Sequence, residues 1–242
     1  MSERSYADSH KGQRRANNQD VSLARDLDDG LTLLIVADGV GGANGGEVAS
    51  AETASAISGF VVANPQLEPA ERLRNAVVLA NDRVRARAKA DIALNGMAST
   101  LVGALVGHGL AWIVNVGDSR AYLCVESASR VLTEDDSWVA EQVRAGALTP
   151  EDAAKSPYQN VVTKGIGVED VLTFDIEETP LSEGDVLLLC SDGLYRVVTP
   201  ETMAATVRGT ALKEAGRRLI ELANRAGGPD NVSVALYREP GE

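Results

Sequence analysis

The sequence is poor in the residues that build several common sites. It has two cysteines and two histidines among 242 residues, and neither Cys124 nor Cys190 has a second cysteine or a histidine at metal-ligand spacing. This pattern argues against a zinc site. Both cysteines lie in apolar runs, so we expect them to be buried, reduced and structural, as in a reducing compartment.

Aromatic side chains and basic charge are also scarce. Aromatic residues make up 4% of the chain, which leaves few platforms on which nucleic-acid bases could stack. The 35 acidic and 23 basic residues give a formal net charge of −12, and such a surface repels phosphate backbones and anionic membranes. A basic cluster at Arg83, Arg85, Arg87 and Lys89 lies where a helix is expected to end, and there it complements the helix dipole. We therefore expect neither nucleic acid nor membrane among the partners.

Long hydrophobic runs are missing as well. The N-terminal segment has no apolar signal core, and no run approaches the ~20 residues of a membrane span, so we expect a cytoplasmic protein. Apolar residues make up 44% of the chain, and no repeat or low-complexity linker interrupts it. This composition predicts one compact domain over residues 1–242, which we expect to be a monomer.

Strands and helices are expected in groups along the chain. Runs rich in Val, Ile and Leu predict strands at residues 31–37, 100–107, 110–116, 121–125, 185–190 and 231–237. His108-Gly109 predicts a tight hairpin turn between the second and third of these strands. Helical spacing of apolar residues predicts helices at about 46–59, after Pro69, and over 212–226. Antiparallel strands grouped between helices favour stacked sheets covered by helices.

Aspartates recur where the predicted strands end. Asp38 follows an apolar run in "LLIVADGVGGANGGEVAS", Asp118 and Asp192 follow two others, and Asp20 and Asp230 each precede one. An Asp-Gly pair alone is only a turn signal. Carboxylates that converge, however, repel one another and raise one another's pKa unless a cation lies among them.

The chemistry of such a cluster favours particular metals. Oxygen ligands without Cys or His favour Mg²⁺ or Mn²⁺ over Zn²⁺. Two such ions can share a carboxylate, activate a water and clamp a phosphoryl group. Glycines after Asp38 would let the backbone approach the metals and the substrate closely.

Eight segments follow one another along the chain: "RRANNQD", "VADGVGGANGGEVAS", "GMASTLVGAL", "VNVGDSRAYL", "LTEDDS", "NVVTKGIG", "LLLCSDGL" and "GGPDNVSV". In order and approximate spacing they resemble the motifs of metal-dependent serine/threonine protein phosphatases of the PP2C, or PPM, family. The resemblance covers about residues 5–238 and is to the bacterial single-domain type. It implies an α+β fold, a four-layer α-β-β-α sandwich of two mainly antiparallel sheets flanked by helices, with a small flap subdomain at about 138–160. It also implies hydrolysis of phosphoserine and phosphothreonine on proteins by a metal-bridging hydroxide, with two or three Mn²⁺ or Mg²⁺ ions.

The resemblance assigns metal-binding roles to individual residues. Asp38 would bridge two ions, with the carbonyl of Gly39 on one of them. Asp192 and Asp230 would complete the ligands of the first ion, and Asp20 would orient a metal-bound water.

Further roles lie around this centre. Asp118, together with Asp192, matches the position of a third metal ion in bacterial members. Arg15 would bind the substrate phosphate through its planar fork. Gln19 and Asn231 would support the site, Asn231 by fixing the loop of Asp230.

Three positions depart from the family pattern. Gln19 stands where many members have glutamate, which would weaken the second metal. Val40 stands where animal members have a histidine proposed as general acid, and neither His10 nor His108 replaces it, so water would protonate the leaving group. Asp136 replaces a usual histidine, with no consequence that follows from the sequence.

Other functions fit less well. An aspartyl-phosphate phosphatase would have a D-x-D pair after a strand, which neither Asp38 nor Asp192 has, and "TKGIG" lacks the order of a phosphate-binding P-loop. The remaining alternative is a weak or inactive phosphatase fold used as a regulatory or binding module, against which the complete ligand set argues. Implied partners are phosphorylated proteins, among them a eukaryotic-like Ser/Thr kinase, its substrates and a phosphothreonine-reading adaptor.

Overall fold

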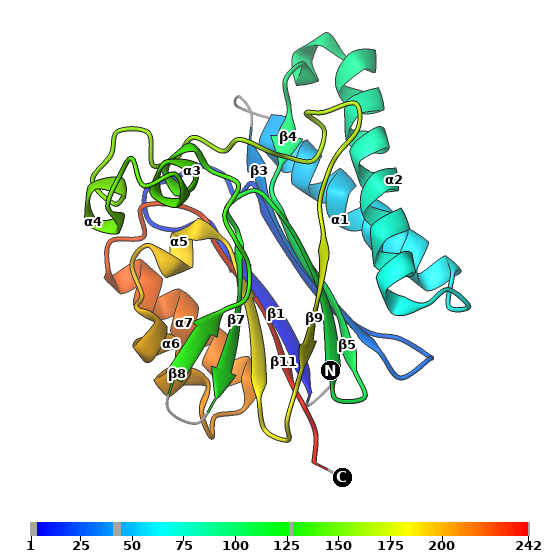
Figure 1. Ribbon diagram of the computed structural model, residues 1–242, viewed down its shortest axis with the longest axis vertical. Coiled ribbons are helices and arrows are strands. Elements are labelled where there is room, and N and C mark those ends of the chain that lie inside the picture. The colour runs from blue at the N-terminus through cyan, green and yellow to red at the C-terminus, as the bar shows by residue number, and fades with distance from the viewer. Residues whose placement is uncertain (1–3, 41–44, 126–127, 242) are drawn as a thin grey trace.

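Two antiparallel β-sheets packed face to face form the centre of the molecule (Figure 1). The computed structural model describes residues 4–40, 45–125 and 128–241. The first sheet contains, in spatial order, β1 (Ser5–His10), β11 (Val232–Arg238), β10 (Val186–Cys190), β7 (Arg120–Val125) and β8 (Ala128–Val131). The second contains β2 (Asp20–Asp26), β3 (Thr32–Val40), β5 (Leu101–Gly107), β6 (Leu110–Val116) and β9 (Ile176–Pro180), and β4 (Ala98–Ser99) pairs with β3.

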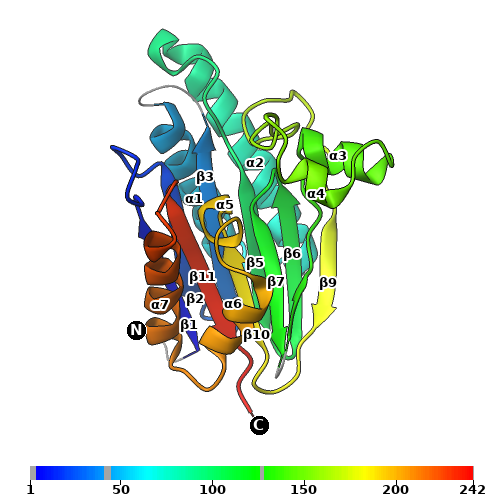
Figure 2. The same cartoon turned by 90° about the vertical axis from the view of Figure 1, so that its left-hand side faces the viewer.

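Helices cover the outer face of each sheet (Figures 1 and 2). α1 (Gly45–Ala63) and α2 (Pro69–Ala90) pack on the second sheet, and the short η1 (Ile92–Leu94) follows them. On the first sheet lie α5 (Asp192–Tyr195), α6 (Pro200–Val207) and α7 (Leu212–Arg225). The expected four-layer α-β-β-α sandwich is confirmed.

The central strands are buried on both faces. In β3, Leu34 and Val36 point between the sheets, whereas Leu33 and Ile35 point toward the helices. A strand covered on both sides reads as a continuous apolar run, which is why the sequence predicted it. All six predicted strands are present, with ends that shift by a few residues, and the hairpin turn places His108 at φ 58°.

Apart from the two-residue β4, the strands that sequence analysis missed are the edges of the sheets. β1 and β8 bound the first sheet, and β2 and β9 bound the second. Each pairs on one side and leaves much of its surface partly exposed, so none carries a long apolar run. Sequence analysis also missed α5 and α6, which are only four and eight residues long.

Both cysteines are buried and free, as expected. The basic cluster near the end of α2 does more than complement the helix dipole. Arg83 and Arg87 form ion pairs with Glu52 of α1, and Arg85 forms one with Asp170. Among the described residues, no helix combines the length and the apolar content needed to cross a membrane.

Residues 138–160, here called the flap segment, leave the sandwich at one end (Figure 1). They form α3 (Trp138–Arg144) and α4 (Pro150–Ala153). The rings of Trp138 and Tyr158 lie 5.1 Å apart, and the amide of Trp138 donates to the carbonyl of Val161 over 2.8 Å. The segment is therefore held together by contacts of its own, and its role as a separate subdomain stays a prediction.

Candidate metal and phosphate site

The five predicted aspartates meet at one end of the sandwich. A cleft of about 560 Å³ is lined by Asp38, Asp118, Asp192 and Asp230 together with Arg15, Gln19, Gly39 and Asn231. Asp20 lies behind this cleft and is buried. The sequence-predicted residues are thus brought together, although they come from distant parts of the chain.

Strand pairing places the two central carboxylates. β3 continues beyond its predicted end to Val40, so Asp38 belongs to the strand and is not a turn residue. The register of β2 and β3 sets Asp20 directly opposite Asp38. The amide of Asp38 is held by the hydroxyl of Thr100 at 3.1 Å, and Thr100 in turn contacts the hydroxyl of Ser119 at 2.8 Å.

Gly39 is required by close packing. Its amide donates to the carbonyl of Gln19 at 3.1 Å. A Cβ on Gly39 would overlap the carbonyl oxygen of Gly46 in the first turn of α1 and lie 2.8 Å from the Gln19 carbonyl oxygen. Only glycine therefore lets β3, β2 and α1 meet here.

Asn231 joins three segments of the site through hydrogen bonds. Its Oδ1 accepts a 2.8 Å hydrogen bond from the amide of Gln19, and its Nδ2 donates to the carbonyls of Lys11 and Asn17, each at 2.9 Å. Its own amide donates to Oδ1 of Asp230 at 2.8 Å. One side chain thus fixes the loop of Arg15 and Asp20 relative to Asp230.

Burial and mutual repulsion disfavour ionised carboxylates in this cluster. Burial raises the pKa of Asp20 to about 6, although Ser191 donates a 2.8 Å hydrogen bond to its Oδ2. Burial, followed by the charges of the neighbouring aspartates, raises the pKa of Asp38 well above its ordinary value. Burial also raises the pKa of Asp192 to about 7 and raises that of Asp118. Such a cluster is most stable with positive charge among its members.

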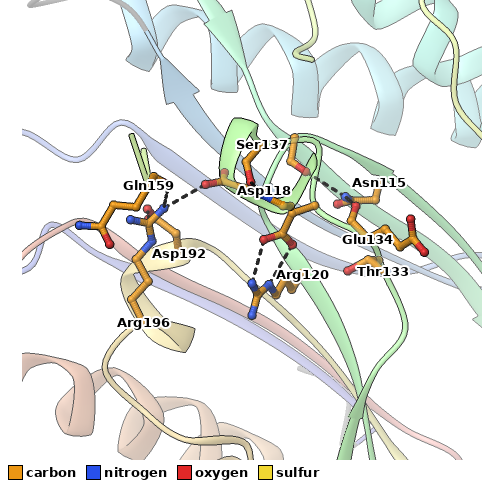
Figure 3. Close-up of polar contacts among 12 residues, drawn as sticks. Asn115, Asp118, Arg120, Thr133, Glu134, Ser137, Gln159, Asp192 and Arg196 are labelled. Atoms are coloured by element: carbon orange, nitrogen blue, oxygen red, sulfur yellow. Dashed lines mark hydrogen bonds and ion pairs between the residues drawn. The ribbon is translucent and has the colours of Figure 1, made fainter. Parts of the chain in front are cut away.

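Two arginines supply positive charge at the site. Arg15 at the rim contacts Oδ2 of Asp230 at 2.7 Å, and its side chain is 55% exposed. Arg196 was not predicted, and its guanidinium reaches both Asp118 and Asp192 (Figure 3). The spacing of Asp192 and Arg196, four residues apart on a helix, is a sequence signal that could have identified the second pair.

The donor set fits a hard divalent cation. Oδ1 of Asp20 and Oδ1 of Asp192 are buried and have no hydrogen-bond partner among the described residues. Unpartnered carboxylate oxygens beside other carboxylates are the ligands that Mg²⁺ and Mn²⁺ prefer. Within the described chain, no group of three His, Cys, Asp or Glu side chains is arranged to hold an ion as it stands. Arginines pair with Asp118, Asp192 and Asp230.

The residues that depart from the family pattern are also placed. Val40 is exposed and lines the cleft. His108 lies in the hairpin at the other end of β5, and Nδ1 of His10 accepts a hydrogen bond from the amide of Gly12. Asp136 accepts a 3.2 Å hydrogen bond from the amide of Gly117 and pairs with Lys164, so it fixes the loop that carries Asp118.

Comparisons with known proteins agree with this geometry. The family described as protein phosphatase 2C matches residues 8–227. The serine/threonine phosphatase Stp of Listeria monocytogenes is 36% identical over 231 residues, which cover 93% of this chain and 92% of Stp. The structure of the Mycobacterium tuberculosis serine/threonine phosphatase PstP/Ppp aligns with a TM-score of 0.89 and 34% identity over 98% of this chain and 99% of that one. The catalytic domain of PstP in complex with two manganese ions aligns with a TM-score of 0.87 and 33% identity, covering 98% of each chain.

Proposed function

The chain belongs to the protein phosphatase 2C family of serine/threonine protein phosphatases, and on this premise we propose which of its residues bind the metal ions and the phosphate. It is a metal-dependent enzyme that removes phosphate from serine and threonine in proteins. The alternative of an inactive binding module is not favoured, because the named relatives are phosphatases. The observation that carries the proposal is that four aspartates line one cleft and that Asp20, a fifth, lies opposite Asp38.

Each carboxylate of the cluster is assigned to one or two of the divalent ions. Asp38, at the centre of the cluster, would hold two Mn²⁺ or Mg²⁺ ions together with the carbonyl of Gly39. Asp192 and Asp230 would complete the ligands of the first ion, and Asp118 with Asp192 would hold a third. Ions bound there supply positive charge for the phosphoryl oxygens and lower the pKa of a water.

The protein's own side chains orient the reactants. Asp20 lies opposite Asp38 and is fixed by Ser191, so its carboxylate can accept a hydrogen bond from the attacking water and hold its direction. Arg15 is exposed at the rim and its fork can take two phosphoryl oxygens once it releases Asp230. Water protonates the departing serine or threonine oxygen, since the described lining of the cleft contains no histidine.

The test compares hydrolysis of a phosphothreonine peptide in Mn²⁺, in Mg²⁺ and in excess EDTA. We expect activity with either ion and none in EDTA. Asp38→Asn should remove nearly all turnover while the circular dichroism spectrum is kept, because a neutral amide replaces the bridging anion. The matched control, Asp82→Asn on the exposed side of α2, should stay active. Full activity in EDTA, or normal turnover of Asp38→Asn, would overturn the proposal.

The physiological substrates of a serine/threonine phosphatase are phosphorylated proteins. We propose that the substrates are a Ser/Thr kinase, the proteins it phosphorylates and a phosphothreonine-reading adaptor, and that the enzyme works in the cytoplasm, which the two free thiols support. Phosphoproteomics of a strain lacking the gene should show raised phosphothreonine at these proteins. An unchanged kinase phosphorylation level would exclude the kinase as a substrate.

A further inference from the structure

Arg196 joins the acidic cluster to the flap segment. The residue caps α5, four positions after Asp192. Its Nε lies 3.0 Å from Oδ2 of Asp192 and its Nη2 lies 3.2 Å from Oδ2 of Asp118. Nη2 also donates to the carbonyl of Gln159 at 3.1 Å, and Nη1 donates to Oδ1 of Asn160. One guanidinium therefore holds two carboxylates of the site and two consecutive residues of the flap segment; Figure 3 shows Asp118, Asp192 and Gln159 around it.

This guanidinium is a fixed charge in an enclosed place. The side chains of Asp118 and Asp192 are 7% and 13% exposed, and that of Arg196 is 24% exposed. Arginine stays protonated throughout the pH range in which proteins are folded. While Arg196 is in this position, Asp118 and Asp192 have a permanent cation between them, which repels a second cation placed there.

The two oxygens of Asp192 face different partners. Oδ2 is held by Arg196, whereas Oδ1 is buried and has no hydrogen-bond partner among the described residues. An ion that uses Oδ1 can bind beside Asp38 and leave Arg196 in place. An ion shared between Asp118 and Asp192 competes with Arg196 for the oxygens that it already holds.

The contact between the flap segment and the sandwich also depends on the guanidinium of Arg196. Tyr158 packs on Trp138, and the amide of Gln159 donates to the carbonyl of Ser156, so this part of the segment is bonded within itself. Arg196 supplies the hydrogen bonds that attach Gln159 and Asn160 to the sandwich. If the guanidinium turns away from the carboxylates, these bonds are lost as well.

We propose that Arg196 is a positioning residue that competes with a divalent ion for Asp118 and Asp192, so that binding of this ion releases Gln159 and Asn160 of the flap segment. The inference rests on the proposed metal site. The ion shared by Asp118 and Asp192 is expected to bind most weakly, because it competes with Arg196. Its binding would also free the segment beside the cleft that a phosphoprotein must enter.

The first test measures Mn²⁺ binding by isothermal titration calorimetry. Arg196→Gln should leave the tightest binding unchanged and tighten the weakest equivalent about tenfold, because a cation next to that position is gone. Arg196→Lys should bind Mn²⁺ nearly as the wild type does, because it keeps the charge. Arg225→Gln is the control, since it removes an arginine from another (i, i+4) pair on α7.

The second test follows the flap segment through Trp138. The chain has two tryptophans, so Trp112→Phe leaves Trp138 as the only one. We expect Mn²⁺ to increase acrylamide quenching of Trp138 in the wild-type background, and Arg196→Gln and Arg196→Lys to show the increased quenching already in EDTA. A lysine cannot replace the forked bonds to Gln159 and Asn160.

The outcomes separate this inference from the function on which it rests. If the wild type binds no Mn²⁺, the proposed metal site is wrong. If it binds Mn²⁺ and Asp38→Asn abolishes this, but both Arg196 variants match Arg225→Gln in affinity and quenching, only the role of Arg196 is refuted. Thermal unfolding of each variant checks that it is folded.

Discussion

Replacing Asp192 with asparagine should stabilise the metal-free protein while it damages the enzyme. The pKa of Asp192 is about 7, against an ordinary value of 3.8. Burial raises it most, Arg196 lowers it, and repulsion from neighbouring aspartates raises it further. The folded protein therefore keeps a proton on Asp192 at pH values where the unfolded chain has lost it. Asparagine has nearly the same shape and mimics this protonated form.

The sign and size of the effect follow from proton linkage. Between pH 4 and about 7 the unfolded chain binds fewer protons at this position, so the free energy of unfolding falls as the pH rises. The contribution of the protonated Asp192 to the stability is fully present below the pKa of this residue in the unfolded chain. It is lost as the pH rises through the pKa of this residue in the folded protein. The shift corresponds to roughly 2 kcal/mol at pH 5 and roughly 4 kcal/mol at pH 8. Asp192→Asn should recover these amounts.

Urea unfolding in EDTA at pH 5 and pH 8 measures the difference. The variant should be more stable at both values, with the larger gain at pH 8, whereas Asp82→Asn should show neither gain. Mn²⁺ at 100 times its Kd should reduce the gain at pH 8 by about 2.7 kcal/mol, because the bound ion stabilises the wild type and not the variant. A variant that is less stable than the wild type in EDTA at pH 8, or a gain independent of pH, would refute the reasoning.

Three further substitutions test other parts of the molecule. Arg15→Ala should lower kcat/KM for a phosphothreonine peptide about 10²–10³-fold and Arg15→Lys should recover part of it, since lysine keeps the charge and not the fork; unchanged kinetics would make Arg15 an ordinary surface residue. Gln19→Glu should lower the Mn²⁺ concentration for half-maximal activity by up to about tenfold, because it adds negative charge beside the metal site, and an equal or greater requirement would contradict its place there. Asp29→Asn should lower the free energy of unfolding in urea by about 2–3 kcal/mol, because Arg72 is only 1% exposed and loses the carboxylate at its Nη1. A change below about 0.5 kcal/mol would show that the hydrogen bond to the Val61 carbonyl is enough to hold Arg72.

Burial explains which strands the sequence reveals. β3, β5 and β10 are covered on both faces, so their apolar runs are continuous and short of polar residues. β1 and β9 carry sequences such as "SYADSH" and "IEETP" and become strands because a neighbour offers free backbone groups. Their structure is thus decided by pairing with a distant segment, which composition within the strand does not encode.

The candidate site was predictable to the extent that its residues follow a motif. The aspartates at strand ends and Asn231 could be named in advance, and the cleft brings them together. Arg196 is different, because its function depends on partners 36 and 37 residues away in a segment without strands. Nothing local distinguishes it from an arginine that pairs with Asp192 alone.

The pairing of β1 with β11 has a practical consequence for handling the protein. Ser5 lies opposite Tyr237, whereas His10 lies opposite Val232, close to Asp230 (Figure 1). Both ends of the described chain therefore leave the sandwich together, and the length of a strand separates them from the cleft. Immobilisation on a sensor chip or fusion to a reporter through either end should leave the cleft open to a macromolecular substrate, and a short linker should be enough to join the ends for circular permutation.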